Sequence, residues 1–414
     1  MGKISDSSLA SSGDKSYQWA RAHMPTLQRT IDKFGEDKPL SGHKLAVCLH
    51  ITKETSVLIR GFQQLGAEVF LSGANPLSTQ DDIAAYLATN GVETWAWRGQ
   101  NSEEYSECIR NTLSSGPDIV VDDGADLHAM IHEGDDYSGL NILGGNEETT
   151  TGVVRLRAME KSGVLRYPLL AINNAQTKFL FDNRYGTGQS VFDGILRSTS
   201  LMIAGKTVVV AGYGWVGKGI AKRARGLDAH IVVTEVDPFK AIEAHMDGFD
   251  VLPMSEAAKR GDIFITATGQ TSVISGIHLE QMKDGAIIAN AGHFDLETDV
   301  KYLNNISVTK EGVRPHVDEH QMQNGRKIYL IGKGRIANLV AAEGHPPEVM
   351  ALSFSNQLLC AVYIAQNHQK LEKKMYDVPE EIDRQVAKNA LEAMGLEIDN
   401  PTDEQIRYSE SWNL

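Results

Sequence analysis

Val208-Val-Val-Ala-Gly-Tyr-Gly-Trp-Val-Gly-Lys-Gly-Ile220 is an apolar run that leads directly into three glycines, Gly212, Gly214 and Gly217. This spacing predicts a strand, a tight turn and a helix whose free N–H groups face a pyrophosphate. Glu235 ends the next apolar run, where its carboxylate would accept hydrogen bonds from ribose hydroxyls and repel a 2′-phosphate. A purely structural glycine turn is the alternative. The complete order of strand, turn, helix, strand and acid favours an NAD site.

The composition indicates a two-domain globular protein that acts on small molecules. The chain has 414 residues, of which 42% are hydrophobic, enough for two packed cores and a tail. With 40 basic and 54 acidic residues the net charge is −14, which argues against nucleic acid or an anionic membrane as partner. The three cysteines are scattered, so we expect no disulfide framework. Without an apolar signal core or a run of roughly 18 apolar residues, we expect a cytoplasmic protein.

Short β-rich runs alternate with helical stretches twice along the chain, which predicts an α/β fold with two Rossmann-like, doubly wound parallel sheets. We expect the first part of a substrate-binding domain at 1–185 and an NAD-binding domain at 186–344. The chain then returns to the substrate domain at 345–375 and ends in a helical tail at 376–414. The expected strands are 44–50, 67–71, 93–97, 118–121 and 168–172, then 206–210, 230–234, 249–252, 263–266 and 286–289. The expected helices include 17–34, a stretch ending at 161, 346–366 and 379–394, with 173–188 partly a connection between domains.

Polar side chains gather near the ends of four apolar runs in the first half of the chain. In open parallel sheets, ligands bind outside the carboxyl ends of the strands, so these groups predict a common cleft. Any one of these residues alone is more often a cap or turn residue. The groups are His50, Thr52 and Glu54; Ser78, Thr79 and Gln80; Asp122, Asp123 and Asp126; and Glu147, Glu148 and Thr149.

Lys178 and Asp182 are four residues apart and would share one face of a helical turn. They stand just before the cofactor domain, where a lysine can reach both substrate and nicotinamide; a surface ion pair is the alternative. His293 follows a predicted strand and has access to proton transfer there.

Two further histidine segments are candidate ligand sites. His345, between a glycine and a proline, is expected at a hinge with a ligand contact, the alternative being a rigid turn alone. His316-Val-Asp-Glu-His320 lacks the zincin order, which needs glutamate directly after the first histidine. We therefore expect no metal.

Together these segments resemble the S-adenosyl-L-homocysteine hydrolases across about 8–395. The resemblance is to the short archaeal and thermophile branch. Longer members end in a segment with lysine and tyrosine that reaches the NAD of a neighbouring subunit, whereas this chain ends Tyr408-Ser-Glu-Ser-Trp-Asn-Leu414. The matching segments are Cys48-Leu-His-Ile-Thr-Lys-Glu54, Ser78-Thr-Gln-Asp81, Asp122-Asp-Gly-Ala-Asp126, Glu147-Glu-Thr-Thr-Thr-Gly152, Phe181-Asp-Asn-Arg-Tyr-Gly186, Ala211-Gly-Tyr-Gly214, Gly292-His-Phe-Asp295 and Gly344-His-Pro346.

The resemblance implies a homotetramer and a bound NAD that is reduced and reoxidised within each turnover. Oxidation of the substrate's 3′-OH to a ketone makes the C4′ hydrogen acidic, so homocysteine can be eliminated as the thiol. Water then adds, and the returned hydride restores the alcohol of adenosine. The cofactor supplies the hydride chemistry, and the protein supplies placement and proton transfer.

The resemblance also assigns roles to single residues. Lys178 is the implied base for the 3′-OH, tuned by Asp182 and Glu148, which bind the ribose hydroxyls. We expect burial and the positive nicotinamide to lower the pKa of this lysine. Asp123 is implied to handle the C4′ proton, and His50 and His293 to serve the thiol and the water. The implied purine-binding residues are Thr52, Glu54, His345 and Met350; the implied cofactor contacts are Thr149, Thr150, Thr151, Asn183 and Asn338, with Gly212, Gly214, Trp215, Val216, Gly217 and Glu235.

Three alternatives remain. The first is the same reaction on S-inosyl-L-homocysteine; Glu54 argues against it, because a carboxylate accepts from adenine's amino group but meets the hypoxanthine carbonyl unfavourably unless protonated. Glu343 stands where the family has a methionine beside the purine, so it also affects the preference between adenine and hypoxanthine. The second is a net NAD-dependent dehydrogenase that releases NADH. The third is an inactive regulator that binds NAD and a nucleoside.

Overall fold

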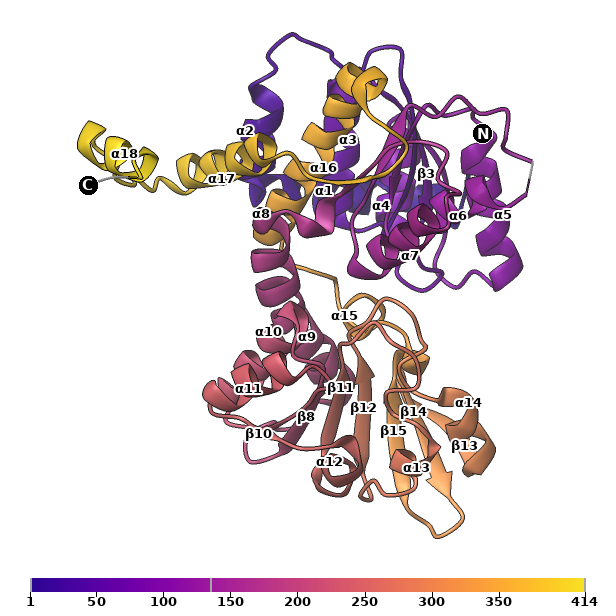
Figure 1. Ribbon diagram of the computed structural model, residues 1–414. Helices are drawn as coiled ribbons and strands as arrows, with labels where there is room; N and C mark the ends of the chain where they lie inside the picture. Colours follow the sequence, from indigo (N-terminus) through magenta and orange to yellow (C-terminus); the bar gives the residue numbers. More distant parts are fainter. Residues whose placement is uncertain (1, 135, 413–414) are drawn as a thin grey trace.

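Two parallel-rich sheets, each in its own domain, organise the chain (Figure 1). The computed structural model describes residues 2–134 and 136–412, and within these each sheet has eight strands. The two domains lie one above the other in Figure 1, and the helical segments around α8, α9 and α16 run between them. The α/β class and the two Rossmann-like sheets expected from the sequence are confirmed.

The first sheet is parallel throughout, in the order β1-β4-β3-β2-β5-β6-β7-β16. Alternate residues of β2 face opposite layers: Leu45, Val47 and Leu49 join one core and Ala46 and Cys48 the other. Both faces are therefore apolar, as buried parallel strands require. The strands are β1 Lys3–Ile4, β2 Lys44–Leu49, β3 Glu68–Gly73, β4 Glu93–Ala96, β5 Ile119–Asp122, β6 Gly144–Glu147, β7 Leu169–Ala171 and β16 Met375–Asp377.

The second sheet has the order β10-β9-β8-β11-β12-β15-β14-β13, in which β14 pairs antiparallel with both β15 and β13. Its strands are β8 Thr207–Ala211, β9 His230–Thr234, β10 Asp250–Val251, β11 Ile263–Thr266, β12 Ala286–Asn290, β13 Ser307–Arg314, β14 Val317–Met322 and β15 Lys327–Ile331. The sequence patterns missed β13, β14 and β15. β13 is almost wholly exposed, so it has no apolar run to mark it.

Helices cover both faces of each sheet. In the first domain α1 to α4 and α16 pack on one face, and α5, α6 and α7 on the other. Their bounds are α1 Ala10–Ala22, α2 Pro25–Asp32, α3 Lys53–Gln64, α4 Asp81–Thr89, α5 Ser102–Leu113, α6 Asp126–His132, α7 Thr150–Lys161, α8 Gln176–Lys178 and α9 Thr187–Thr199. The rest are α10 Trp215–Arg225, α11 Pro238–Met246, α12 Met254–Arg260, α13 Gly276–Leu279, α14 Val300–Ile306, α15 Ala337–Val340, α16 Pro347–Asn367, α17 Glu380–Met394 and α18 Asp403–Glu410.

Two expected elements differ in the structure. The single helix at 17–34 is a pair, α1 and α2, because Pro25 has no N–H to continue a helix and instead starts a new one. The segment 173–188, expected partly as a connection, is helical for most of its length. It contains α8, a π-helix at Phe179–Gly186 and the start of α9.

Helix α16 corrects the expectation about long apolar runs. By length and hydropathy alone, residues 347–370 are sufficient to cross a membrane. However, 67% of the most apolar window is buried inside the protein, and the helix packs against α2, α3 and α17. We therefore assign it as a core helix, which brings the chain back to the first domain.

Candidate active site

A pocket lies where the carboxyl ends of both sheets meet. In each sheet the chain first adds strands on one side and then on the other, which leaves a switch point between β2 and β5 and another between β8 and β11. Ligands of doubly wound folds bind at such points. Of the residues expected from the sequence, these line the pocket: His50, Thr52, Glu54, Asp123, Glu148, Thr149, Thr150, Lys178, Asp182, Asn183, Val216, His293, Asn338, His345 and Met350.

Lys178 is the centre of a buried polar cluster at the hinge. Its ammonium lies 2.8 Å from Asp182 Oδ2 and 3.7 Å from Glu148 Oε1, and it donates to Asn183 Oδ1 at 2.8 Å. The π-helix brings this about, because its wider turn directs Lys178, Asp182 and Asn183 toward one site. The surface ion pair, weighed as the alternative, is excluded: both side chains are at most 6% exposed.

Contrary to expectation, the protein's own groups do not lower the pKa of Lys178. Burial works in that direction, but the carboxylates of Asp182 and Glu148 outweigh it and raise the pKa of Lys178. The pKa of Asp182 is lowered, because Lys178 and His345 offset its burial. His345 Nδ1 contacts Asp182 directly, and its Nε2 lies 3.2 Å from Thr187 Oγ1, which ties the hinge to the cluster.

Glu148 is held by helix α16. Ser353 Oγ donates to Glu148 Oε1 at 2.5 Å, and Gln357 Nε2 donates to Glu148 Oε2. Burial raises the pKa of Glu148 to about 7, against the opposing effect of Lys178. A carboxyl group with this pKa can exchange a proton with a neighbouring base near neutral pH.

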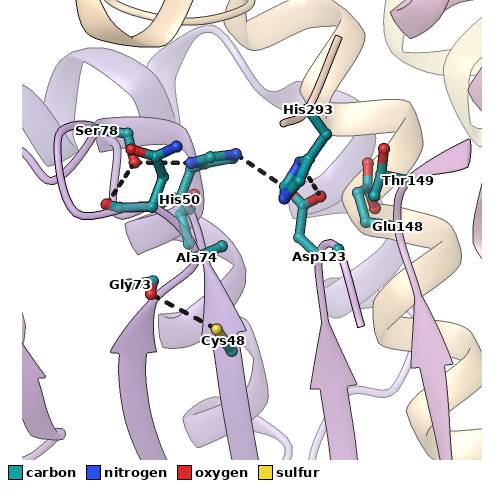
Figure 2. Close-up of polar contacts among 12 residues, drawn as sticks. Cys48, His50, Gly73, Ala74, Ser78, Asp123, Glu148, Thr149 and His293 are labelled. Atoms are coloured by element: carbon teal, nitrogen blue, oxygen red, sulfur yellow. Dashed lines mark hydrogen bonds and ion pairs between the residues drawn. The ribbon is translucent and has the colours of Figure 1, made fainter. Parts of the chain in front are cut away.

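Asp123 lies between two imidazoles (Figure 2). Its Oδ2 is 3.6 Å from His50 Nε2, and its Oδ1 is 3.7 Å from His293 Nδ1. His293 comes from the second domain, so the domains are in contact here. Burial lowers the pKa of His50 to about 4, which keeps the ring neutral at physiological pH. Its Nδ1 lies 2.7 Å from Ser78 Oγ, which in turn donates to Asn75 O.

His50, Asp123 and His293 also form a group that could hold a metal ion, although the sequence predicts none. One ligand atom each of His50, Asp123 and His293 lie within 4.8 Å of one another, a spacing that a metal ion could also use. The absence of a metal therefore stays a prediction. His316 and His320 join no such group among the described residues.

Glu147 and Asp122 lie beneath the pocket as paired positions of β5 and β6. Glu147 Oε1 accepts from Gly124 N and from Thr149 N, both at 2.9 Å. One carboxyl group thus holds the turn after Asp123 and the turn after Glu148. Burial raises the pKa of Glu147 well above its usual value.

The second domain carries a glycine-rich turn beside the pocket. Gly212 has φ 95°, and a Cβ on Gly217 would lie 1.9 Å from Gly212 O, so the turn after β8 requires both glycines. Helix α10 begins at Trp215, whose ring stacks on Phe179 at 5.3 Å. Glu235 accepts from Tyr213 N, at 2.7 Å, which fixes its carboxylate at the mouth of the turn. Gly212, Gly214, Trp215, Gly217, Glu235 and Thr151 lie outside the pocket lining itself.

These features fit a dinucleotide. Thr151, at the start of α7, lies against Gly269 of the second domain. Within the described chain, Thr151 Oγ1 and Asn338 Oδ1 are buried without a hydrogen-bond partner. Two oxygens left in this state beside a glycine-rich helix start can take hydrogen bonds from a bound cofactor.

Family models match both halves of the chain. The model "S-adenosyl-L-homocysteine hydrolase" matches residues 2–144, and its "NAD binding domain" matches residues 183–344. The chain belongs to the S-adenosyl-L-homocysteine hydrolase family. It is thus a hydrolase-family enzyme with NAD as its cofactor, as expected from the glycine turn and the strand-end residues.

Curated relatives extend the match over nearly the whole chain. An adenosylhomocysteinase of Saccharolobus solfataricus is 56% identical over 99% of this chain and 98% of its own length. One of Aeropyrum pernix is also 56% identical, over 99% of both chains. An S-inosyl-L-homocysteine hydrolase of Methanocaldococcus jannaschii is 52% identical over 100% of this chain and 99% of its own.

Several residues of the site were not expected from the sequence. Asn173 follows β7 and its Oδ1 lies 3.4 Å from Lys178 Nζ, so the strand-end rule would have found it. Ser353, Phe354 and Gln357 follow Met350 on α16 at helical spacing, which was also a usable signal. Lys53 had no such signal, because only its neighbours in space make it part of the site.

Proposed function

We propose that the enzyme reversibly hydrolyses S-adenosyl-L-homocysteine to adenosine and L-homocysteine, with NAD retained throughout. The observation that carries this proposal is the buried cluster of Lys178, Asp182, Asn183 and Glu148 at the edge of the NAD-binding domain. Its carboxylates and amide suit a vicinal diol, and its lysine suits removal of a hydroxyl proton. A hydrolase has no evident need for an alcohol-oxidising base, unless the alcohol is oxidised only temporarily.

Lys178 is the base for the 3′-OH in this proposal. Its raised pKa means that it must first give up a proton before it can act as a base, and the positive nicotinamide of bound NAD would favour that loss. Asp182 stays ionised and keeps the lysine oriented toward the pocket. Glu148 and Asp182 then accept from the ribose hydroxyls.

Asp123 is the proposed base at C4′, and the two imidazoles serve the leaving thiol and the entering water. His50 is neutral, so it can take a proton from water or thiol without first losing one. His293 approaches the opposite oxygen of Asp123 from the second domain. Closure of the domains is therefore needed to complete this part of the site.

NAD would be held by the glycine turn, Glu235, Thr149, Thr150, Thr151, Asn183 and Asn338, and it supplies a hydride acceptor for C3′ that returns the hydride at the end of the cycle. The remaining chemistry belongs to the chain's own residues, which bind the ribose, move protons and exclude water. Thr52, Glu54, His345 and Met350 line the purine end in this proposal.

Free thiol release tests the proposal. The purified enzyme with bound NAD is given S-adenosyl-L-homocysteine, and thiol and nicotinamide absorbance are followed together. We expect thiol release without steady accumulation of NADH. Accumulating NADH without thiol would instead establish the net dehydrogenase. The absence of both on the adenosine and the inosine thioether alike, with NAD bound, would establish the inactive regulator.

S-inosyl-L-homocysteine is the second candidate substrate, favoured by the relative of that name at 52% identity. Both candidates share the ribose chemistry and differ only at the purine, where Glu54 favours the adenine form.

We also propose a cytoplasmic homotetramer. Its support in this chain is apolar surface that a monomer leaves in water. The C-terminal segment exposes Ile398, Tyr408 and Trp412, which are 71%, 66% and 95% exposed. Sedimentation of the purified protein tests the oligomeric state.

A further inference from the structure

A row of alternating charges borders the purine end of the pocket. Lys53 Nζ lies 3.2 Å from Glu54 Oε1 and 3.0 Å from Glu343 Oε2. Arg197 Nη1 contacts the other oxygen of Glu343 at 3.1 Å. Lys53 and Glu54 begin α3 of the first domain, whereas Arg197 and Glu343 belong to the second, so the row crosses between domains.

Glu54 is the only acidic member of this row that reaches the pocket. Its side chain is 1% exposed, whereas that of Glu343 is 55% exposed. The pocket around it includes the apolar side chains of Leu49, Met350 and Phe354. Among the described residues, Glu54 Oε1 has Lys53 Nζ at 3.2 Å and no contact with full hydrogen-bond geometry. Lys53 thus pairs with this carboxyl group, which also lines the pocket and can meet a ligand there.

The protonation state of Glu54 decides which ligand group it can meet. An ionised carboxylate only accepts hydrogen bonds and pairs with an exocyclic amino group, whereas a protonated carboxyl also donates and pairs with a carbonyl. Burial raises the pKa of Glu54, and Lys53 opposes this effect most strongly among the neighbouring charges. The lysine therefore favours the form that accepts.

We propose that Lys53 is a specificity-determining residue, whose ammonium selects an amino-purine over an oxo-purine by stabilising the ionised Glu54. This inference rests on the proposed thioether hydrolysis and adds to it the residue that determines which purine the substrate carries. Glu343 and Arg197 hold the lysine in place from the other domain, and the imidazoles of His50 and His345 are the other titratable groups of the pocket near this end.

The proposal predicts a pH dependence of substrate choice. Only the inosine thioether requires the protonated carboxyl, so the ratio of kcat/KM for S-adenosyl- over S-inosyl-L-homocysteine varies inversely with the protonated fraction of Glu54. It should therefore rise by up to about tenfold per pH unit, because above the pKa one pH unit lowers that fraction about tenfold. Falling pH should shift the enzyme toward the inosine thioether.

The experiment compares four variants over pH 6 to 8.5, a chosen working range. In Lys53→Met the ratio should fall roughly tenfold or more at every pH, the effect of about one unit of pKa. Lys53→Arg keeps the charge and should keep the wild-type ratio. Glu54→Gln cannot ionise and should give a ratio that no longer varies with pH. Lys259→Met removes a surface lysine paired with Glu256 and should leave the ratio unchanged.

Two results would overturn the role of Lys53: a Lys53→Met ratio within twofold of wild type at every pH, or an equal loss in Lys53→Arg. Bound NAD and melting temperature are measured for each variant, so a fall in total activity from misfolding is separated from a change in ratio. Failure of the wild type to release thiol from either thioether would instead overturn the proposed function.

Discussion

The two sheets share a doubly wound topology, yet they offer their ligands different chemistry. After β2 and β5 the first sheet presents His50 and Asp123, side chains that titrate. At the matching place, after β8, the second sheet presents Gly212 and the backbone that follows it. In the proposed function, the reacting end of the substrate meets ionisable groups, whereas the cofactor meets main-chain N–H groups and a helix start. We therefore propose that the same topology supports catalysis in the first domain and retention of the cofactor in the second.

The largest expected effect comes from removing the lysine that joins these two regions. Lys178→Met should keep NAD bound but lower the rate at which adenosine reduces it by about 10²- to 10⁴-fold, the usual contribution of a general base. Single-turnover absorbance of the nicotinamide measures this rate. Lys259→Met, which removes an exposed lysine instead, is the control. Reduction at near the wild-type rate would exclude Lys178 as the base and weaken the contrast between the domains.

A substitution on the cofactor side should act through the backbone. Gly217→Ala places a Cβ 1.9 Å from Gly212 O, so the turn must shift; we expect a loss of about 1–3 kcal/mol of stability together with weaker NAD binding. Gly214→Ala is the matched control for stability, because no atom lies within 4 Å of its added Cβ. Melting temperature and bound NAD report the two effects. Equal melting temperatures for both variants would mean that the turn is less constrained than its geometry implies.

The smallest expected effect concerns the pH dependence of stability on the substrate side. The folded-state pKa of Glu148, about 7, lies above the ordinary value of 4.5, so the folded protein binds this proton more tightly than the unfolded chain. The resulting stabilisation is fully present below about pH 4.5 and is lost as the pH rises through 7. Glu148→Gln should therefore show a flatter fall in melting temperature between pH 5 and 7.5 than the wild type. Parallel curves would contradict the raised pKa.

The sequence predicted the charged side of the site well, because strand ends carry their own signal. His50 and Asp123 each follow an apolar run, Glu148 follows the strand β6, and the parallel topology brings such positions together. Contacts that depend on two distant segments could not be predicted in this way. The position of Lys53 between Glu54 and Glu343 depends on how the domains meet, and no local pattern encodes that.

Two local features also escaped prediction for physical reasons. The π-helix at Phe179–Gly186 has a hydrogen-bond spacing that helical periodicity does not describe. β13, at the edge of the second sheet, and its neighbour β14 carry many polar residues, and β13 is covered on neither face. The interior strands that the sequence predicted carry apolar runs, as burial on both faces demands, whereas the interior strands β6 and β15 were not predicted.

Helix α16 has a consequence for the shape of acceptable nucleosides. Met350 lies at the proposed purine end, whereas Ser353 and Gln357 hold Glu148 at the proposed ribose end. A helix rises about 1.5 Å per residue and does not stretch, so these contacts are spaced by a rigid rod. Nucleoside analogues in which a methylene separates base from sugar should engage one end or the other, and therefore bind without being turned over.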